Sequence, residues 1–119
     1  MSGLAKALRS AGFPGVEEEG GRVFARLISA DVEFSGAEGP EGWDLAISRP
    51  VRASPAQMAD WAARHPGAAL DIHQGETRLC GRVAAGDRDG LLHWAALAEE
   101  MVVACLHWRR GQRSRGEGM

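Results

Sequence analysis

The sequence predicts one α+β domain in which helices pack on an antiparallel sheet, in the order helix, three strands, helix, two strands, helix. Two observations predict this class. Apolar residues recur at steps of three and four over residues 89–110, which is the period of an amphipathic helix. Over residues 22–48 and 69–83 the period changes to two, which is typical of strands with one buried face. A chain of 119 residues can form one such core.

Residues 2–11 are predicted to form the first helix. Ser2 can cap it, and Gly12 followed by Pro14 ends it. Its apolar stripe consists of Leu4, Ala7, Leu8 and Ala11. A helix this short is marginal in isolation, so we expect it to dock on the rest of the domain.

The first two strands are predicted at residues 22–28 and 31–36, where apolar and polar residues alternate. Gly20-Gly21 marks a turn, and residues 16–19 can add a short strand before it. Residues 36–42 hold three glycines and one proline, which predicts a loop.

The third strand is predicted at residues 43–48, and Arg49-Pro50 ends it or moves it to an edge of the sheet. Ser54-Pro55 then opens the second helix with a capping serine and a first-turn proline. Met58 and Trp61 lie along one side of this helix, which ends at His65-Pro66-Gly67.

Residues 69–73 and 77–83 form a predicted hairpin, because a glycine-containing loop separates two short apolar runs. The last helix follows, and residues 111–119 are expected to be a disordered tail after the single domain of residues 2–110. The main stripe of the last helix consists of Leu91, Trp94, Ala95, Ala98, Met101, Val102, Cys105 and Trp108. Leu92, Leu97, Val103 and Leu106 fall outside or beside it. This surplus indicates burial on two sides or a surface for self-association.

The composition argues against several classes of protein. A formal net charge of −2 leaves no basic footprint for nucleic acid, and the arginines of the tail suit a helix C-terminus. No apolar run approaches the roughly 20 residues of a membrane span, and no signal peptide is apparent, so we expect a cytoplasmic protein. Cys80 and Cys105 sit in apolar-periodic segments and are expected to be free and buried.

No motif predicts a reaction or a cofactor. His65, His73, His93 and His107 are too scattered for a metal site. Cys80 lies between Arg78 and Arg82 on one strand face, where guanidinium groups can activate a thiol. We expect instead an ordinary strand face with small and charged groups, and a protein that is not an enzyme.

The predicted element order resembles the type III secretion chaperone-like fold, which class I secretion chaperones share with YbjN-type proteins. The resemblance is topological, covers residues 2–110, and includes the short first helix and the long last helix with Leu97 and Met101. It implies a small homodimeric protein without enzymatic activity. Class I members bind an extended segment of a secretion substrate on hydrophobic patches. They are typically strongly acidic, whereas this chain has a pI near 6.1 and a basic tail. The YbjN-like version, whose substrate is unknown, is therefore favoured almost as much as a secretion chaperone.

Carried over by position, the resemblance implies two sets of contact residues. Met58 and Trp61 would lie near the dimer contact. Partner contacts would fall on Leu4, Leu8, Val23, Leu27, Val32 and Phe34. The resemblance therefore implies a chaperone-like protein that captures a segment of a partner. The alternative is a small ligand-binding or enzymatic domain with a pocket between the sheet and the last helix, using His93 or His107.

Overall fold

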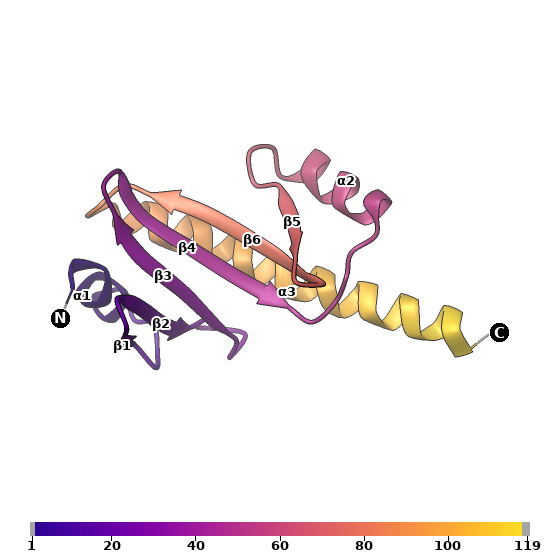
Figure 1. Cartoon of the computed structure of the whole chain (residues 1–119), viewed down its shortest axis with the longest axis horizontal. Helices are drawn as coiled ribbons and strands as arrows, with labels where there is room; N and C mark the ends of the chain where they lie inside the picture. Colours follow the sequence, from indigo (N-terminus) through magenta and orange to yellow (C-terminus); the bar gives the residue numbers. More distant parts are fainter. Residues whose placement is uncertain (1, 118–119) are drawn as a thin grey trace.

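The computed structural model describes residues 2–117, with side chains described up to residue 112. Six antiparallel strands form one sheet in the order β1-β2-β3-β4-β6-β5, and three helices accompany it (Figure 1). The elements are α1 (Gly3–Ser10), β1 (Glu17–Glu19), β2 (Arg22–Arg26), β3 (Glu33–Gly39), β4 (Gly42–Arg49), α2 (Pro55–Arg64), β5 (Leu70–His73), β6 (Glu76–Val83) and α3 (Arg88–Glu117). The predicted α+β class is confirmed, with the short strand β1 added to the first block.

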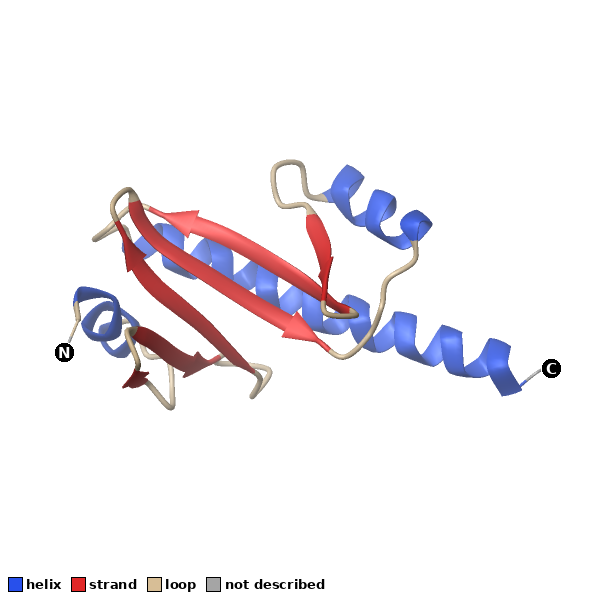
Figure 2. Ribbon diagram, viewed as in Figure 1, coloured by secondary structure: helices blue, strands red, loops and turns tan. Residues whose placement is uncertain are grey.

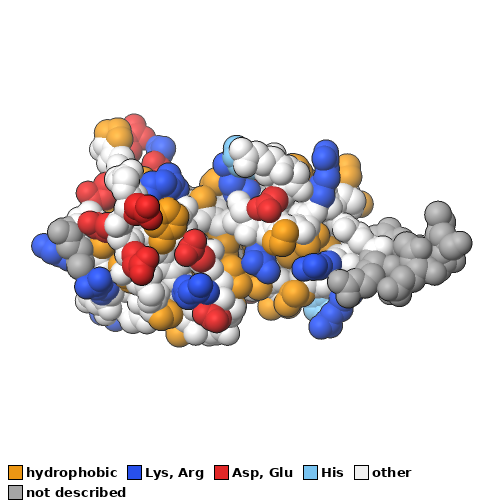
Figure 3. Space-filling view, turned by 60° about the horizontal axis from the view of Figure 1, so that its bottom comes forward, with side chains coloured by type: hydrophobic (Ala, Val, Ile, Leu, Met, Phe, Trp, Pro, Cys, Tyr) orange, Lys and Arg blue, Asp and Glu red, His pale blue; other side chains and the backbone are white. Residues whose placement is uncertain are grey.

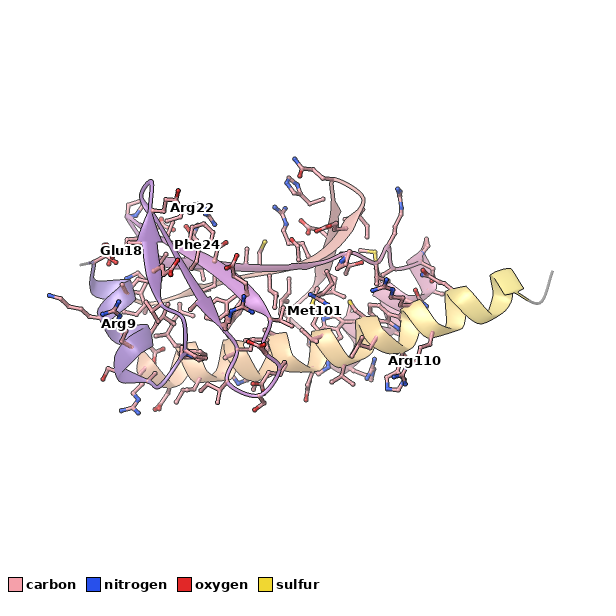
Figure 4. The ribbon with its side chains drawn as sticks, turned by 90° about the horizontal axis from the view of Figure 1, so that it is seen from below. Arg9, Glu18, Arg22, Phe24, Met101 and Arg110 are labelled. Carbon is pink, nitrogen blue, oxygen red and sulfur yellow. The ribbon has the colours of Figure 1, made fainter. Side chains whose placement is uncertain are left out.

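The long helix α3 lies along one face of the sheet (Figures 1 and 2). The other face of β2, β3, β4 and β6 carries no helix, as the view along the sheet in Figure 4 shows. The predicted main stripe of α3 is confirmed, because its residues from Leu91 to Cys105 are buried and Trp108 is partly buried. The ring of Phe34 in β3 contacts two aromatic rings. Its centroid lies 5.4 Å from that of Trp94 in α3 and 5.5 Å from that of Phe13, which follows α1.

The loop predicted at residues 36–42 is wrong, because β3 and β4 continue into a tight hairpin with only Pro40-Glu41 at its tip. Gly36 and Gly42 are needed in this hairpin because neighbouring atoms occupy the space that a side chain would fill. A Cβ at Gly36 would meet side-chain atoms of Leu45 and Leu4 at 2.9 and 3.0 Å. At Gly42, whose φ is +139°, it would lie 2.5 Å from the carbonyl oxygen of Val83.

The buried hydroxyl of Thr77 ties the segment before α2 to β6. Its Oγ1 donates to the carbonyl oxygen of Val51 and accepts from the Ala53 amide at 2.9 Å. Ser54 and Gln57 form a capping box at the start of α2, as the Ser54-Pro55 signal predicted for this position. This linker therefore fixes where α2 begins relative to the sheet.

In the structure α3 runs on to Glu117, through most of the tail expected at residues 111–119; residues 118–119 lie outside the described part. Once a helix is nucleated on a core, each added residue contributes one more backbone hydrogen bond. Gln112 Nε2 also donates to the Arg52 carbonyl oxygen at 3.0 Å. The end of α3 projects beyond the sheet (Figure 1). Within residues 2–117, no helix is long and apolar enough to span a membrane.

Candidate binding groove between α2 and α3

A groove of about 750 Å³ runs between α2 and α3. Its floor is largely apolar, and charged groups occupy its rim. The lining residues are Trp61, Arg64 and His65 of α2 with Ala96, Glu99, Glu100, Val103, Ala104, His107 and Trp108 of α3. Trp61 is the one fully buried residue of α2, and Met58 packs partly buried against the core, so the helix contacts the domain along a narrow side and leaves the groove open beside it.

Trp61 and His65 fix the α2 wall of the groove. The Trp61 indole Nε1 donates to the Ala68 carbonyl oxygen at 2.7 Å, and its ring lies 4.2 Å from the His65 ring, centroid to centroid. His65 Nε2 in turn lies 3.2 Å from Glu100 Oε2 on α3. The two walls are therefore connected across the groove by one polar contact.

A second apolar stripe on α3 borders the groove and is open to solvent. Leu92 is 38% exposed, Val103 53% and Leu106 45%. Ile28, in the turn after β2, is 55% exposed and adjoins Ser29, whose amide donates to Glu99 Oε1 at 3.1 Å. In Figure 3, hydrophobic side chains interrupt the charged surface between the centre of the molecule and its grey end. Large apolar groups gathered in this way are typical of interaction sites.

One sequence pattern, the surplus of apolar residues on the last helix, indicated this stripe. Of the four surplus apolar residues of α3, Leu97 is partly buried, but Leu92, Val103 and Leu106 are not covered by a second layer. Burial on two sides is therefore wrong for these three residues. The sequence could not show the groove itself, because the path from β4 to α2 decides where its other wall lies.

The partner contacts implied by the resemblance fall elsewhere. Val32 is partly buried, and the other five are core side chains: Leu4, Leu8, Val23, Leu27 and Phe34 are at most 3% exposed. They hold α1 and α3 against β2 and β3, so they form no accessible surface in this structure. At the implied dimer contact, Trp61 is 1% exposed and Met58 is partly buried.

The cysteines differ from each other, and the expectation that both are buried is wrong for Cys80. Cys80 is exposed on the uncovered sheet face, whereas Cys105 is buried. Desolvation raises the pKa of the Cys80 thiol although Arg78 opposes the effect, and it raises the pKa of Cys105 to about 11. Arg78 is paired with Asp71 at 2.7 Å, and Arg82 with Asp44 at 2.8 Å. A raised pKa disfavours the thiolate form that acts as a nucleophile.

Within the described residues, no group of three or more His, Cys, Asp or Glu side chains is placed to hold a metal ion. The space between the sheet and α3 is filled by core side chains such as Trp94 and Met101. His93 is exposed on α3, and His107 lines the α2–α3 groove instead.

Comparisons with protein-family models, with curated proteins and with solved structures found no match to this chain.

Proposed function

We propose that this chain is a non-enzymatic, chaperone-like protein-binding module that docks a segment of a protein partner along α3, in the α2–α3 groove. One observation carries the proposal: Leu92, Val103 and Leu106 are exposed on one side of α3, beside an apolar groove. Leaving three large apolar side chains in water is unfavourable by about 25 cal/mol per Å² of exposed apolar surface. A partner that covers them removes this cost.

The shape and charge of the groove favour an amphipathic helix as the docked segment. An apolar face laid into an apolar groove is a common mode of peptide recognition. Glu99 and Glu100 lie on the rim, so basic residues beside the apolar face of the partner would improve the fit. A cytoplasmic location and a protein rather than a nucleic-acid or membrane partner belong to the same proposal.

A small ligand in this groove is the second candidate. A volume of about 750 Å³ lies within the usual range for ligand sites, and the His65–Glu100 pair offers polar groups beside apolar walls. The two candidates differ in a thermal-shift screen of metabolites. Saturable stabilisation by one compound, lost in Val103→Asp, would favour the ligand.

Site-specific photo-crosslinking in the cells that make this protein tests the docking surface. A photoreactive residue at Val103 should yield an adduct with a protein, because this side chain is exposed beside the groove. The same residue at Ser48, which is exposed on the uncovered sheet face, is the matched control and should yield none. Equal adducts at both positions, or none at Val103, would contradict the proposal.

A further inference from the structure

We infer that the helix docked along α3 is α3 of a second copy of this chain, packed antiparallel to the first about a two-fold axis. The inference rests on the proposed function, because it names the partner of the same surface. Its support comes from the spacing, the exposure and the charge of residues on α3.

The exposed stripe of α3 has the spacing of a coiled-coil seam. Steps of four and three residues place one set of side chains on one line of a helix, and helices that carry such a line pack against each other along it. The set consists of Leu92, Ala96, Glu99, Val103, Leu106 and Arg110. Glu99 is partly buried and the other five are exposed, so the stripe is separate from the line that faces the sheet.

The order of residues along the stripe fits one antiparallel register. When Val103 faces Leu106 of the second copy, the two-fold axis repeats the same contact with the roles exchanged. Val103 and Leu106 of each copy then contact Leu106 and Val103 of the other copy, and these two apolar contacts form the centre of the interface. Shifting the second helix by one heptad, seven residues, places Glu99 against Val103 of the second copy. This register desolvates a carboxylate against an apolar group.

The flanking charges favour the same register. Glu99 then faces Arg110 of the second copy, and the two-fold axis supplies this acid–base contact at both ends of the apolar centre. A parallel pair would instead set Glu99 against Glu99 and Arg110 against Arg110, which is repulsive. The hydrogen bond from the Ser29 amide holds Glu99 Oε1 in place, and a carboxylate has acceptor positions left for a guanidinium. Charge complementarity therefore selects a second copy in antiparallel orientation.

The surroundings of the stripe leave room for a second helix. The α2–α3 groove adjoins it on one side, with Trp61 and His65 in the wall. On the other side the Ile28 side chain is exposed next to Ser29. The last turns of α3 project beyond the sheet, so the helix of a second copy can follow the stripe past the end of the domain (Figure 4).

Sedimentation equilibrium of the purified full chain, from about 1 µM to about 300 µM, tests the inference. We expect a monomer–dimer equilibrium. Glu99→Lys and Arg110→Glu should each raise the dimer dissociation constant about tenfold, because each sets like charges together at both ends of the contact. An equimolar mixture of the two variants should form a heterodimer about as tight as the original homodimer, since opposite charges then meet at both ends.

The mixture is the decisive measurement, and circular dichroism confirms that each variant folds. A surface that associates only through non-specific apolar contact would not regain affinity when the Glu99→Lys and Arg110→Glu variants are mixed. A chain that stays monomeric over the whole range, or a mixture as weak as either variant alone, overturns the inference. If the Val103 photo-adduct is then a different protein, the proposed function stands without the second copy; if no adduct forms, both fall.

Discussion

Trp94 of α3 lies directly against the backbone of Gly81 in β6, where the absent side chain of glycine leaves room for the indole ring. A Cβ on Gly81 would overlap the Cδ1 and Nε1 atoms of the indole ring. Among the described side chains, Trp94 Nε1 is also the one buried nitrogen or oxygen without a hydrogen-bond partner. Burying an unpaired N–H is unfavourable by about 1–3 kcal/mol. The packing of the Trp94 ring on β6 must therefore offset the free energy lost by burying its unpaired Nε1–H group.

We predict that Gly81→Ala lowers the free energy of unfolding by about 1–3 kcal/mol, because the added methyl group overpacks a rigid site. Urea denaturation of the variant measures the change. The control is Gly81→Ala combined with Trp94→Phe, whose smaller ring relieves the overlap, so the two effects should not add. A single variant within about 0.5 kcal/mol of the parent would show that the indole moves freely.

Asp71 and Arg78 form a two-point ion pair on the uncovered sheet face, with Arg78 Nε 3.0 Å from Asp71 Oδ1 and Nη2 2.7 Å from Oδ2. These hydrogen bonds from the guanidinium lower the pKa of Asp71. A carboxyl group whose pKa is lower in the folded state stabilises the fold above its unfolded pKa of about 3.9. That contribution is lost as the pH falls through the folded pKa.

Asp71→Asn should therefore lower the free energy of unfolding by about 0.2–1 kcal/mol at pH 7, since half of the Asp71 side chain is exposed and water screens the pair. The difference from the parent chain should disappear at a pH below the folded pKa of Asp71. Urea denaturation at several pH values measures it, with Glu33→Gln on the same exposed face as the control. A difference that persists unchanged in acid would exclude the ion pair as its cause.

At the scale of elements, α1 is a short helix that depends on docking. Its Ser2 cap accepts from the Ala5 amide, and Glu38 of β3 accepts from the Leu4 amide at 2.8 Å. Leu4 and Leu8 are both at most 1% exposed. The element predicted from residues 2–11 is confirmed, but its apolar side chains belong to the core and not to a partner surface.

Leu8→Ala distinguishes these two roles. A core leucine should cost about 2–5 kcal/mol of unfolding free energy when it is truncated, because the removed atoms leave a cavity. Thermal or urea denaturation measures the loss, and Lys6→Ala on the exposed side of the same helix is the control. Unchanged stability in Leu8→Ala would restore the interpretation of Leu8 as a surface contact.

The hairpin of β3 and β4 shows why element boundaries were harder to predict than element types. Glycine and proline at residues 36–42 have high turn propensity, and that propensity predicts a loop. In the structure, Gly36 pairs with Leu45 in register, and its missing side chain admits Leu4 of α1. A tertiary contact therefore decides the conformation that local propensity left open.

At the scale of the whole molecule, the domain is elongated, with principal extents of 52 × 26 × 24 Å. The end of α3 projects beyond the sheet (Figure 1), and the exposed residues Leu92, Val103 and Leu106 lie along the same helix. A second copy along this surface would cover Val103 and Leu106, which the isolated domain leaves in water. The stability of the fold should then depend on protein concentration through the dimer equilibrium.

The sequence by itself determined the type and order of the main helices and strands but not all of their bounds, because the periods of two and 3.6 follow from the backbone geometry of each element. It also determined which side of α3 is buried, and it indicated a surplus of apolar residues there. Only the tertiary structure decided what that surplus means. In the folded chain Val103 and Leu106 stay exposed, whereas Leu4, Leu8 and Leu27 are buried in the core between the sheet and the helices. Periodicity reports the faces of one element, whereas exposure depends on which other elements reach each face.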